Sequence, residues 1–153
     1  NKCAVYPSYF QEASIMHILV IDGQGGGLGA ALVTRLKARL GNAVQIWAVG
    51  TNSHATSVML KAGADRAATG ENAVIQCCRQ ADVVAGPIGI LIAGAMLGEI
   101  TAPMAAAVGQ SPARLVLIPN AKSGAHICGL QQMPLSQYIE EAAKKIEEIL
   151  EGK

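Results

Sequence analysis

Aromatic and charged side chains are scarce in this chain of 153 residues. Aromatic residues make up 3% and charged residues 15%, and the formal net charge is +1. Proteins that bind nucleic acid usually offer a basic face and aromatic rings on which bases stack. The composition therefore argues against a nucleic-acid partner. The hydrophobic fraction of 51% excludes a disordered chain and suits one packed domain.

Patterns typical of metal sites, disulfides and membrane spans are also missing. The four cysteines include the adjacent pair Cys77 and Cys78, and no Cys-x-x-Cys spacing occurs. We interpret them as reduced thiols and expect a cytoplasmic protein without a metal site. The uncharged run 83–98 contains four glycines and a proline. It is shorter than the roughly 18–20 apolar residues of a spanning helix, so no membrane partner is expected.

The first 15 residues differ from the rest of the sequence. They show no regular hydrophobic period, whereas a clean apolar run begins directly after Met16. We interpret residues 1–15 as a leader, an arm or a segment added for expression. Residues 16–153 are then expected to form one Rossmann-like domain.

Continuous apolar runs alternate with helical patterns from Met16 onward. Strands that are apolar throughout are typical of a parallel sheet covered on both faces. Strands are predicted at 16–22, 43–49, 65–69, 82–85 and 114–119, and the pattern leaves open a sixth at 125–129. Helices are predicted at 28–40, 52–62, 71–80 and 134–150, and a broken apolar helix is predicted over 88–98 and 101–108, interrupted near Pro103. The sequence thus predicts a single α/β, three-layer Rossmann-like domain with a mainly parallel sheet of five or six strands.

The segment 22–29, Asp-Gly-Gln-Gly-Gly-Gly-Leu-Gly, joins the first predicted strand to the first predicted helix. It fits Gly-x-x-x-Gly-x-Gly at Gly23, Gly27 and Gly29, and Gly-x-Gly-x-x-Ala at Gly25, Gly27 and Ala30. Both are dinucleotide-binding patterns. Without Cβ atoms, glycines let backbone N–H groups reach a pyrophosphate, and the helix N-terminus adds partial positive charge. The alternative is that the glycines only allow a tight turn and close helix–sheet packing.

Ligands of a doubly wound sheet bind beyond the carboxyl ends of its strands. We therefore predict that the cofactor-binding residues follow the strands at that edge. They are Gly23, Gln24, Gly25, Gly26, Gly27, Leu28, Gly29, Thr51, Asn52, Ser53, Thr69, Glu71, Asn72, Gly86 and Pro87. The polar residues at 69–72 could instead only cap the third helix, and Pro87 could only start the next one.

A carboxylate that would bind a ribose is missing from the end of the second predicted strand. Residues 49–54 read Val-Gly-Thr-Asn-Ser-His, whereas NAD-binding Rossmann proteins place an acid about 20 residues after the glycines. Small polar groups there could accept the 2′-phosphate of NADP, although no Arg is adjacent. NAD and NADP both stay open as cofactors. Asn52 or Ser53 could equally cap a helix, and Asp22 is expected to cap N–H groups of the glycine loop.

No catalytic constellation emerges from the sequence. The Tyr-x-x-x-Lys pair of short-chain dehydrogenases is absent, because Tyr138 is followed four positions later by Ala142. The P-loop lysine is also absent, so ATP hydrolysis of that kind is not expected. Catalytic residues stay unassigned, and whether the protein is an enzyme stays open. If it is one, we expect an NAD(P)-dependent oxidoreductase-like protein without the Tyr–Lys pair.

Eight short motifs occur together along the chain, at 20–29, 50–52, 59–64, 68–73, 81–82, 86–90, 96–101 and 117–120. Together they resemble a small bacterial Rossmann-like family, a domain of unknown function. The similarity spans about residues 16–149 and leaves out the first 15. The resemblance implies the fold and a nucleotide site, and it implies no activity.

The function predicted from the sequence is binding of a nucleotide or an NAD(P)-like dinucleotide through the glycine loop. One alternative is a non-enzymatic, oligomeric sensor or scaffold. The apolar, glycine-rich region 88–108 motivates it, since Gly94 and Gly98 would let another helix approach closely. Another alternative is a small enzyme that acts on a phosphorylated metabolite. The expected partners are a small-molecule nucleotide and further copies of the chain.

Overall fold

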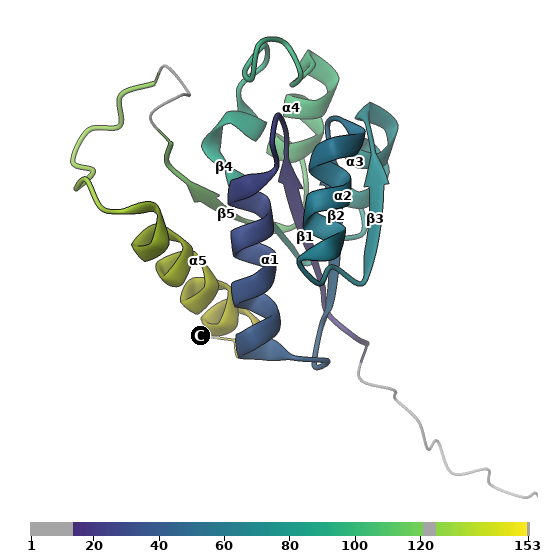
Figure 1. Cartoon of the computed structure of the whole chain (residues 1–153), viewed down its shortest axis with the longest axis vertical. Helices are drawn as coiled ribbons and strands as arrows, with labels where there is room; N and C mark the ends of the chain where they lie inside the picture. Colours follow the sequence, from purple (N-terminus) through teal and green to yellow (C-terminus); the bar gives the residue numbers. More distant parts are fainter. Residues whose placement is uncertain (1–13, 121–124, 153) are drawn as a thin grey trace, which may run out of the picture.

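A computed structural model describes residues 14–120 and 125–152 (Figure 1). Residues 1–13, which are most of the expected leader or arm, lie outside the described residues. The strands are β1 (His17–Asp22), β2 (Gln45–Gly50), β3 (Arg66–Thr69), β4 (Val83–Pro87) and β5 (Arg114–Ile118). They form one sheet in the order β3-β2-β1-β4-β5, and every neighbouring pair is parallel. The predicted α/β Rossmann-like fold is confirmed.

Helices cover both faces of this sheet (Figure 1). They are α1 (Gly27–Leu40), α2 (Ser53–Lys61), α3 (Glu71–Cys78), α4 (Ala102–Gly109) and α5 (Leu135–Leu150), with the short 3₁₀ helix η1 (Ile88–Leu91). Alternate side chains of β1 point to opposite faces. Ile18 and Val20 are buried with α1, α2 and α5, whereas Leu19 and Ile21 are buried with α3, α4 and η1. The result is a three-layer domain with one core on each side of the sheet.

The second half of the predicted broken helix, 101–108, corresponds to α4, whereas the first half, 88–98, is helical only over η1. After η1 the chain runs through turns and starts α4 only at Ala102, where the Thr101 hydroxyl accepts a hydrogen bond from Met104 N–H at 3.2 Å. Met96 and Leu97 have φ of 58° and 57°, and the glycines on either side of them are also left-handed. A right-handed helix cannot continue through left-handed residues. Only part of this apolar region is buried: Ile90, Ile100, Met104 and Val108 lie in the core, whereas Leu97 is exposed.

The predicted sixth strand is also wrong. Residues 125–127 are irregular and 128–129 form a turn. A strand added in parallel beside β5 needs a crossover of a dozen residues or more, and only six residues separate Ile118 from Ala125. The chain instead leaves the sheet after β5 and returns to it as α5.

The order of the strands creates a divergence at β1. The chain leaves β1 toward β2 on one side, and it leaves β4 toward β5 on the other. In open parallel sheets this switch point is where ligands bind, beyond the carboxyl ends of the strands. Asp22, the last residue of β1, is in register with Gly50, the last of β2. The loops that follow β1 and β2 therefore begin side by side.

Candidate functional site

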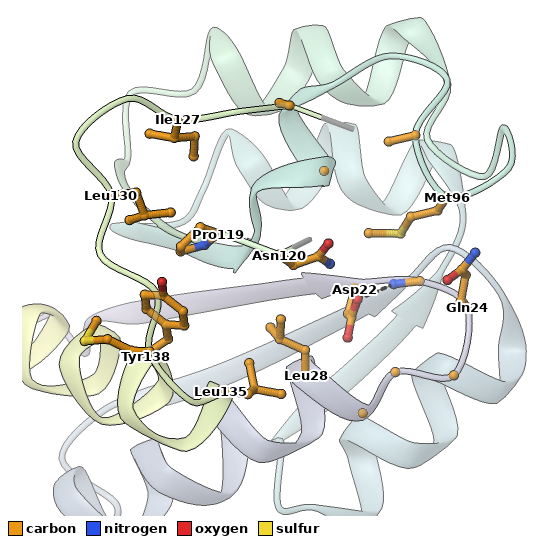
Figure 2. Close-up of a pocket in the computed structure, with 18 of the residues that line it drawn as sticks. Asp22, Gln24, Leu28, Met96, Pro119, Asn120, Ile127, Leu130, Leu135 and Tyr138 are labelled. Carbon is orange, nitrogen blue, oxygen red and sulfur yellow. Dashed lines mark hydrogen bonds between the residues drawn. The ribbon is translucent and has the colours of Figure 1, made fainter. Parts of the chain in front are cut away.

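A cavity of about 1190 Å³ opens beyond the carboxyl end of β1 (Figure 2). Three stretches of chain line it: the glycine loop with the start of α1, the turns after η1, and the β5–α5 connection with the start of α5. The lining residues are Asp22, Gly23, Gln24, Gly25, Gly26, Gly27, Leu28, Gly89, Ala95, Met96, Leu97, Pro119, Asn120, Ala125, His126, Ile127, Leu130, Gln132, Met133, Leu135 and Tyr138. The cavity lies at the switch point of the sheet.

Close packing surrounds Gly23, where a Cβ would lie 2.5 Å from the Thr51 hydroxyl, and it also requires glycine at two positions against α2. Gly26 caps α1 with a left-handed φ of 70°, and a Cβ there would lie 2.8 Å from the backbone of Ala55. A Cβ on Gly29 would lie 2.6 Å from the Met59 sulfur. Both distances are too short for real atoms, so α1 could not approach α2 and β1 this closely with larger residues. For these two positions the purely structural interpretation of the loop is correct.

Gly25 and Gly27 have no such requirement. A Cβ built at either position meets nothing within 4 Å, and neither residue has a left-handed φ. Both are exposed. Their backbone N–H groups and that of Leu28 make no hydrogen bond within the described part of the chain. Three unpaired donors thus lie at the N-terminus of a 14-residue helix, on the wall of the cavity.

Asp22 shapes the loop from inside. Its side chain is 5% exposed, and its two carboxylate oxygens accept hydrogen bonds from Gly23 N–H at 2.8 Å and Gly29 N–H at 2.7 Å. Burial raises the pKa of Asp22 above its ordinary value, against the lowering effect of the two backbone hydrogen bonds, and the charge of Glu99 raises it further. The expected capping of loop N–H groups by Asp22 is confirmed.

Glu99 reaches the same loop from the turns after η1. One of its oxygens accepts from Gln24 N–H at 2.6 Å, and the other accepts from the Asn52 side-chain amide at 2.7 Å. The Asn52 amide also donates to Gln24 C=O at 3.0 Å, and its oxygen caps α2 through Ala55 N–H at 2.9 Å. Sequence reasoning missed Glu99, whose only signal is that it ends the uncharged run 83–98.

The predicted site residues beyond β2 and β3 do not line the cavity. The Thr51 hydroxyl is buried and has no hydrogen-bond partner among the described residues. Ser53 and Asn72 are exposed. The Thr69 hydroxyl lies 2.7 Å from that of Thr56, and the carboxylate of Glu71 accepts from the Thr101 hydroxyl at 2.5 Å. Of these residues, Thr69 ends the edge strand β3, Thr51 follows β2, Ser53 begins α2, and Glu71 and Asn72 begin α3.

The predicted residues at the end of β4 are buried instead. A Cβ on Gly86 would lie 2.2 Å from Ile21 C=O, so this glycine allows β4 to pack beside β1. Pro87 is the last residue of β4 and precedes η1, which fits the alternative that it only starts a helix. The next glycine, Gly89, lines the cavity in their place.

The wall opposite the glycine loop is apolar, and sequence reasoning missed it entirely. Ile127, Leu130 and Met133 come from the β5–α5 connection, and Leu135 and Tyr138 come from α5 (Figure 2). The Tyr138 hydroxyl donates to Gln131 C=O at 2.6 Å and so ties the connection to the helix. Of the lining residues in the described chain, only Asp22, His126 and Tyr138 carry ionisable side chains. A ligand here would meet an apolar surface on one side and backbone donors on the other.

Residues 14–120 and 125–152 contain no group of three or more His, Cys, Asp or Glu side chains placed to hold a metal ion. None of their helices is both long enough and apolar enough to cross a membrane.

Comparison with solved structures finds similar folds at low identity. The crystal structure of AibC is 16% identical with a TM-score of 0.45, over 86% of this chain and 42% of that one. This chain therefore spans about two fifths of the length of that protein. A dodecameric FMN-dependent Ubix-like decarboxylase from Escherichia coli O157:H7 is 18% identical with a TM-score of 0.40, over 87% and 76%. A universal stress protein in complex with cAMP is 18% identical with a TM-score of 0.41, over 69% and 98%.

Comparison of the sequence with curated proteins gives no significant match. One protein-family model, described as a domain of unknown function, matches residues 17–151.

Proposed function

Because this chain belongs to the DUF3842 family, a domain of unknown function, over residues 17–151, we propose its function from the site itself: it binds a nucleotide or dinucleotide with a phosphate on the glycine loop. The single observation that carries the proposal is the group of unpaired backbone donors at Gly25, Gly27 and Leu28. They lie at a helix N-terminus, where partial positive charge favours an anion. Two of the three positions are glycines that the fold itself does not need.

The size and lining of the cavity support the same ligand class. Small-molecule sites are commonly about 300–1,000 Å³, so about 1190 Å³ leaves room for a ligand as large as a dinucleotide. An aromatic base or nicotinamide-like ring would pack on the apolar wall that includes Leu130, Leu135 and Tyr138. The phosphate and the ring would then occupy opposite sides of one cavity.

The carboxylate of Asp22 does not oppose this arrangement. Both of its oxygens accept backbone hydrogen bonds inside the loop, so its charge is directed toward Gly23 and Gly29. An incoming phosphate meets the N–H groups on the other side of the loop. Binding alone is proposed, and an NAD(P)-dependent reaction would need reacting groups beyond Asp22, His126 and Tyr138.

The test is a thermal-shift panel with NAD⁺, NADH, NADP⁺, NADPH, ATP and inorganic phosphate on the wild type and on Gly27→Ala. A ligand at 100 times its Kd stabilises by about 2.7 kcal/mol, or on the order of 5–10 °C for this size. The methyl group of Gly27→Ala meets no protein atom but would stand where the phosphate approaches. We expect the free variant to melt near the wild type and to lose most of the shift.

Gly109→Ala is the matched control. It is also a glycine-to-alanine change inside a helix, it lies at the end of α4, and it does not line the cavity. Its ligand-induced shift should equal that of the wild type. The proposal is contradicted if no compound shifts the wild type at millimolar concentration, or if Gly27→Ala responds as Gly109→Ala does.

Assembly with further copies of the chain is a second candidate, supported by the nearly full exposure of Leu97 at 98%. Gly94 and Gly98, which were expected to let a neighbouring helix approach, lie in turns with a left-handed backbone rather than on a helix. Leu97 on such a turn would offer one apolar side chain to another copy of the chain, not the row of residues along a helix that helix–helix packing uses. The molar mass in solution decides this candidate, and a strict monomer would exclude it.

A further inference from the structure

Glu99 brings a carboxylate to the place where the sequence lacks one. No Asp or Glu occurs in the loop after β2, and Asn52, the residue that caps α2 there, already uses its side-chain amide in three hydrogen bonds. Glu99 lies against this amide at 2.7 Å and against Gln24 N–H at 2.6 Å. The two partners belong to the loops after β1 and β2, so Glu99 bridges the ends of these neighbouring strands from a distant part of the chain.

This carboxylate has acceptor capacity left for a ligand. Each oxygen accepts one hydrogen bond from the protein, and a carboxylate oxygen can accept two. The bond to Gln24 N–H is solvent-exposed, so a ligand can reach it. The hydroxyl of Thr51 is buried and has no partner among the described residues. It lies on the same side of Gly23 as this carboxylate, because a Cβ built on Gly23 would lie 2.5 Å from Thr51 Oγ1 and 2.9 Å from Glu99 Oε2.

The ribose and the 5′-phosphate of a nucleotide are adjacent, as are the Glu99 carboxylate bound to Gln24 and the donors that begin at Gly25. Gln24 directly precedes Gly25, the first of the unpaired phosphate donors. In a nucleotide the ribose is attached directly to the 5′-phosphate. A phosphate on Gly25 and Gly27 therefore allows its ribose to lie next to Gln24, within reach of Glu99.

We propose, on the basis of the nucleotide binding proposed above, that Glu99 accepts hydrogen bonds from the ribose 2′- and 3′-hydroxyls and so selects a ribose without a 2′-phosphate. A 2′-phosphate would place its charge against the carboxylate. Between Gly50 and Met59 the sequence has no Lys or Arg and only His54 as a basic side chain. Glu99 thus does for this chain what an acid at the end of the second strand does in NAD-binding Rossmann proteins.

The experiment is calorimetric titration of the full chain with NAD⁺ and NADP⁺, for the wild type, Glu99→Gln, Glu99→Lys and Glu141→Gln. Like charges a few ångströms apart at a surface reduce affinity by about tenfold or more, so the wild type should prefer NAD⁺ by at least that factor. Glu99→Gln should lose most of this preference, and Glu99→Lys should reverse it. Glu141→Gln removes the same charge from an exposed position on α5 and should keep the wild-type preference.

A purely structural role for Glu99 gives a different result. If Glu99 only bridges Gln24 and Asn52, both Glu99 variants should bind NAD⁺ and NADP⁺ more weakly by the same factor. The ratio of the two affinities would then equal that of the wild type, and this result overturns the inference. Equal binding of NAD⁺ and NADP⁺ by the wild type also overturns it. The proposed nucleotide binding would still stand in that case if Gly27→Ala loses the ligand-induced shift in the thermal-shift panel. If neither NAD⁺ nor NADP⁺ binds the wild type, the inference about Glu99 is overturned as well. The proposed function is then tested separately by the thermal shifts with ATP and inorganic phosphate.

Discussion

Single residues of the glycine loop serve two different purposes. Gly26 and Gly29 are fixed by close packing against Ala55 and Met59, whereas Gly25 and Gly27 face open space. The sequence predicted the loop and its position from the glycine spacing alone. It could not separate the two kinds of glycine, because the backbone of Ala55 and the sulfur of Met59, which crowd Gly26 and Gly29, belong to α2, about 30 residues away.

Glu99 shows the same limit at a functional position. Its contacts with Gln24 and Asn52 join residues 75 and 47 positions apart. No local period or motif encodes such a contact, so a search for an acid after the second strand finds nothing. Only the folded chain brings the carboxylate to that place.

The substitution Asp22→Asn tests how the buried Asp22 carboxylate affects the free energy of unfolding. The amide keeps one acceptor but turns its NH₂ toward a backbone N–H, leaving a buried donor unpaired at a cost of about 1–3 kcal/mol. Burial raises the pKa of Asp22 in the folded state above 3.8. Folding therefore favours the protonated form, and this stabilisation is full below pH 3.8 and lost as the pH rises through the folded pKa.

The free energy of unfolding of wild type and Asp22→Asn, measured in urea across the acid range, should show this sign. The difference between them should be largest below pH 3.8 and should shrink to a constant value toward neutral pH. A difference that grows as the pH rises would mean that the two N–H hydrogen bonds outweigh burial.

Among the elements, α1 and α5 are held together by ion pairs as well as by apolar contacts. Arg39 donates to Glu140 at 2.5 Å and to Glu147 at 2.7 Å, and Arg35 also donates to Glu140. Their buried faces include Leu36 and Ile146. Because α5 carries part of the cavity wall, the docking of α5 on α1 fixes how far that wall lies from the glycine loop.

Glu140→Gln tests this docking through its pH dependence. The hydrogen bond from Arg35 lowers the pKa of Glu140, against the opposing effect of burial, and the charges of Arg35 and Arg39 lower it further. A lowered folded pKa stabilises the protein above the unfolded value of 4.5, and this contribution is lost as the pH falls through the folded pKa. The variant should melt below the wild type at neutral pH, and the gap should close in acid.

Glu141→Gln, on the exposed face of the same helix, is the control for loss of one charge. Its melting temperature should stay close to the wild type at every pH. A gap for Glu140→Gln that persists unchanged well below pH 4.5 would contradict a role of its ionised form in docking α5.

The elements with a regular hydrophobic period were the ones the sequence predicted well. The predicted strands and helices coincide with β1–β5 and with α1, α2, α3 and α5 to within a few residues. The two errors lie in segments without such a period. At 92–101 Met96 and Leu97 have a left-handed backbone, with the Met96 sulfur packed over Gly23. At 125–129 residues of an apolar stretch line the cavity instead of forming a strand.

At the scale of the whole molecule, the cavity joins three segments far apart in the sequence around the switch point. The sheet beneath it is buried on both faces, whereas the backbone N–H groups of Gly25, Gly27 and Leu28 in the loop that lines it have no partner among the described residues. Backbone amides without a partner exchange with solvent rapidly, and those in buried strands exchange slowly. Binding of a ligand should therefore slow exchange in the lining loops and leave the sheet unchanged.

Amide hydrogen exchange of the wild type, with and without the compound that gives the largest thermal shift, tests this. We expect new protection at Gly25, Gly27 and Leu28, where a phosphate would supply the missing acceptor, and in the segments 95–97 and 125–133. The strands β1 and β4 are protected in both states and serve as the internal reference. Protection spread evenly over the molecule would indicate global stabilisation from a ligand bound elsewhere, whereas protection confined to these segments places the ligand in the cavity.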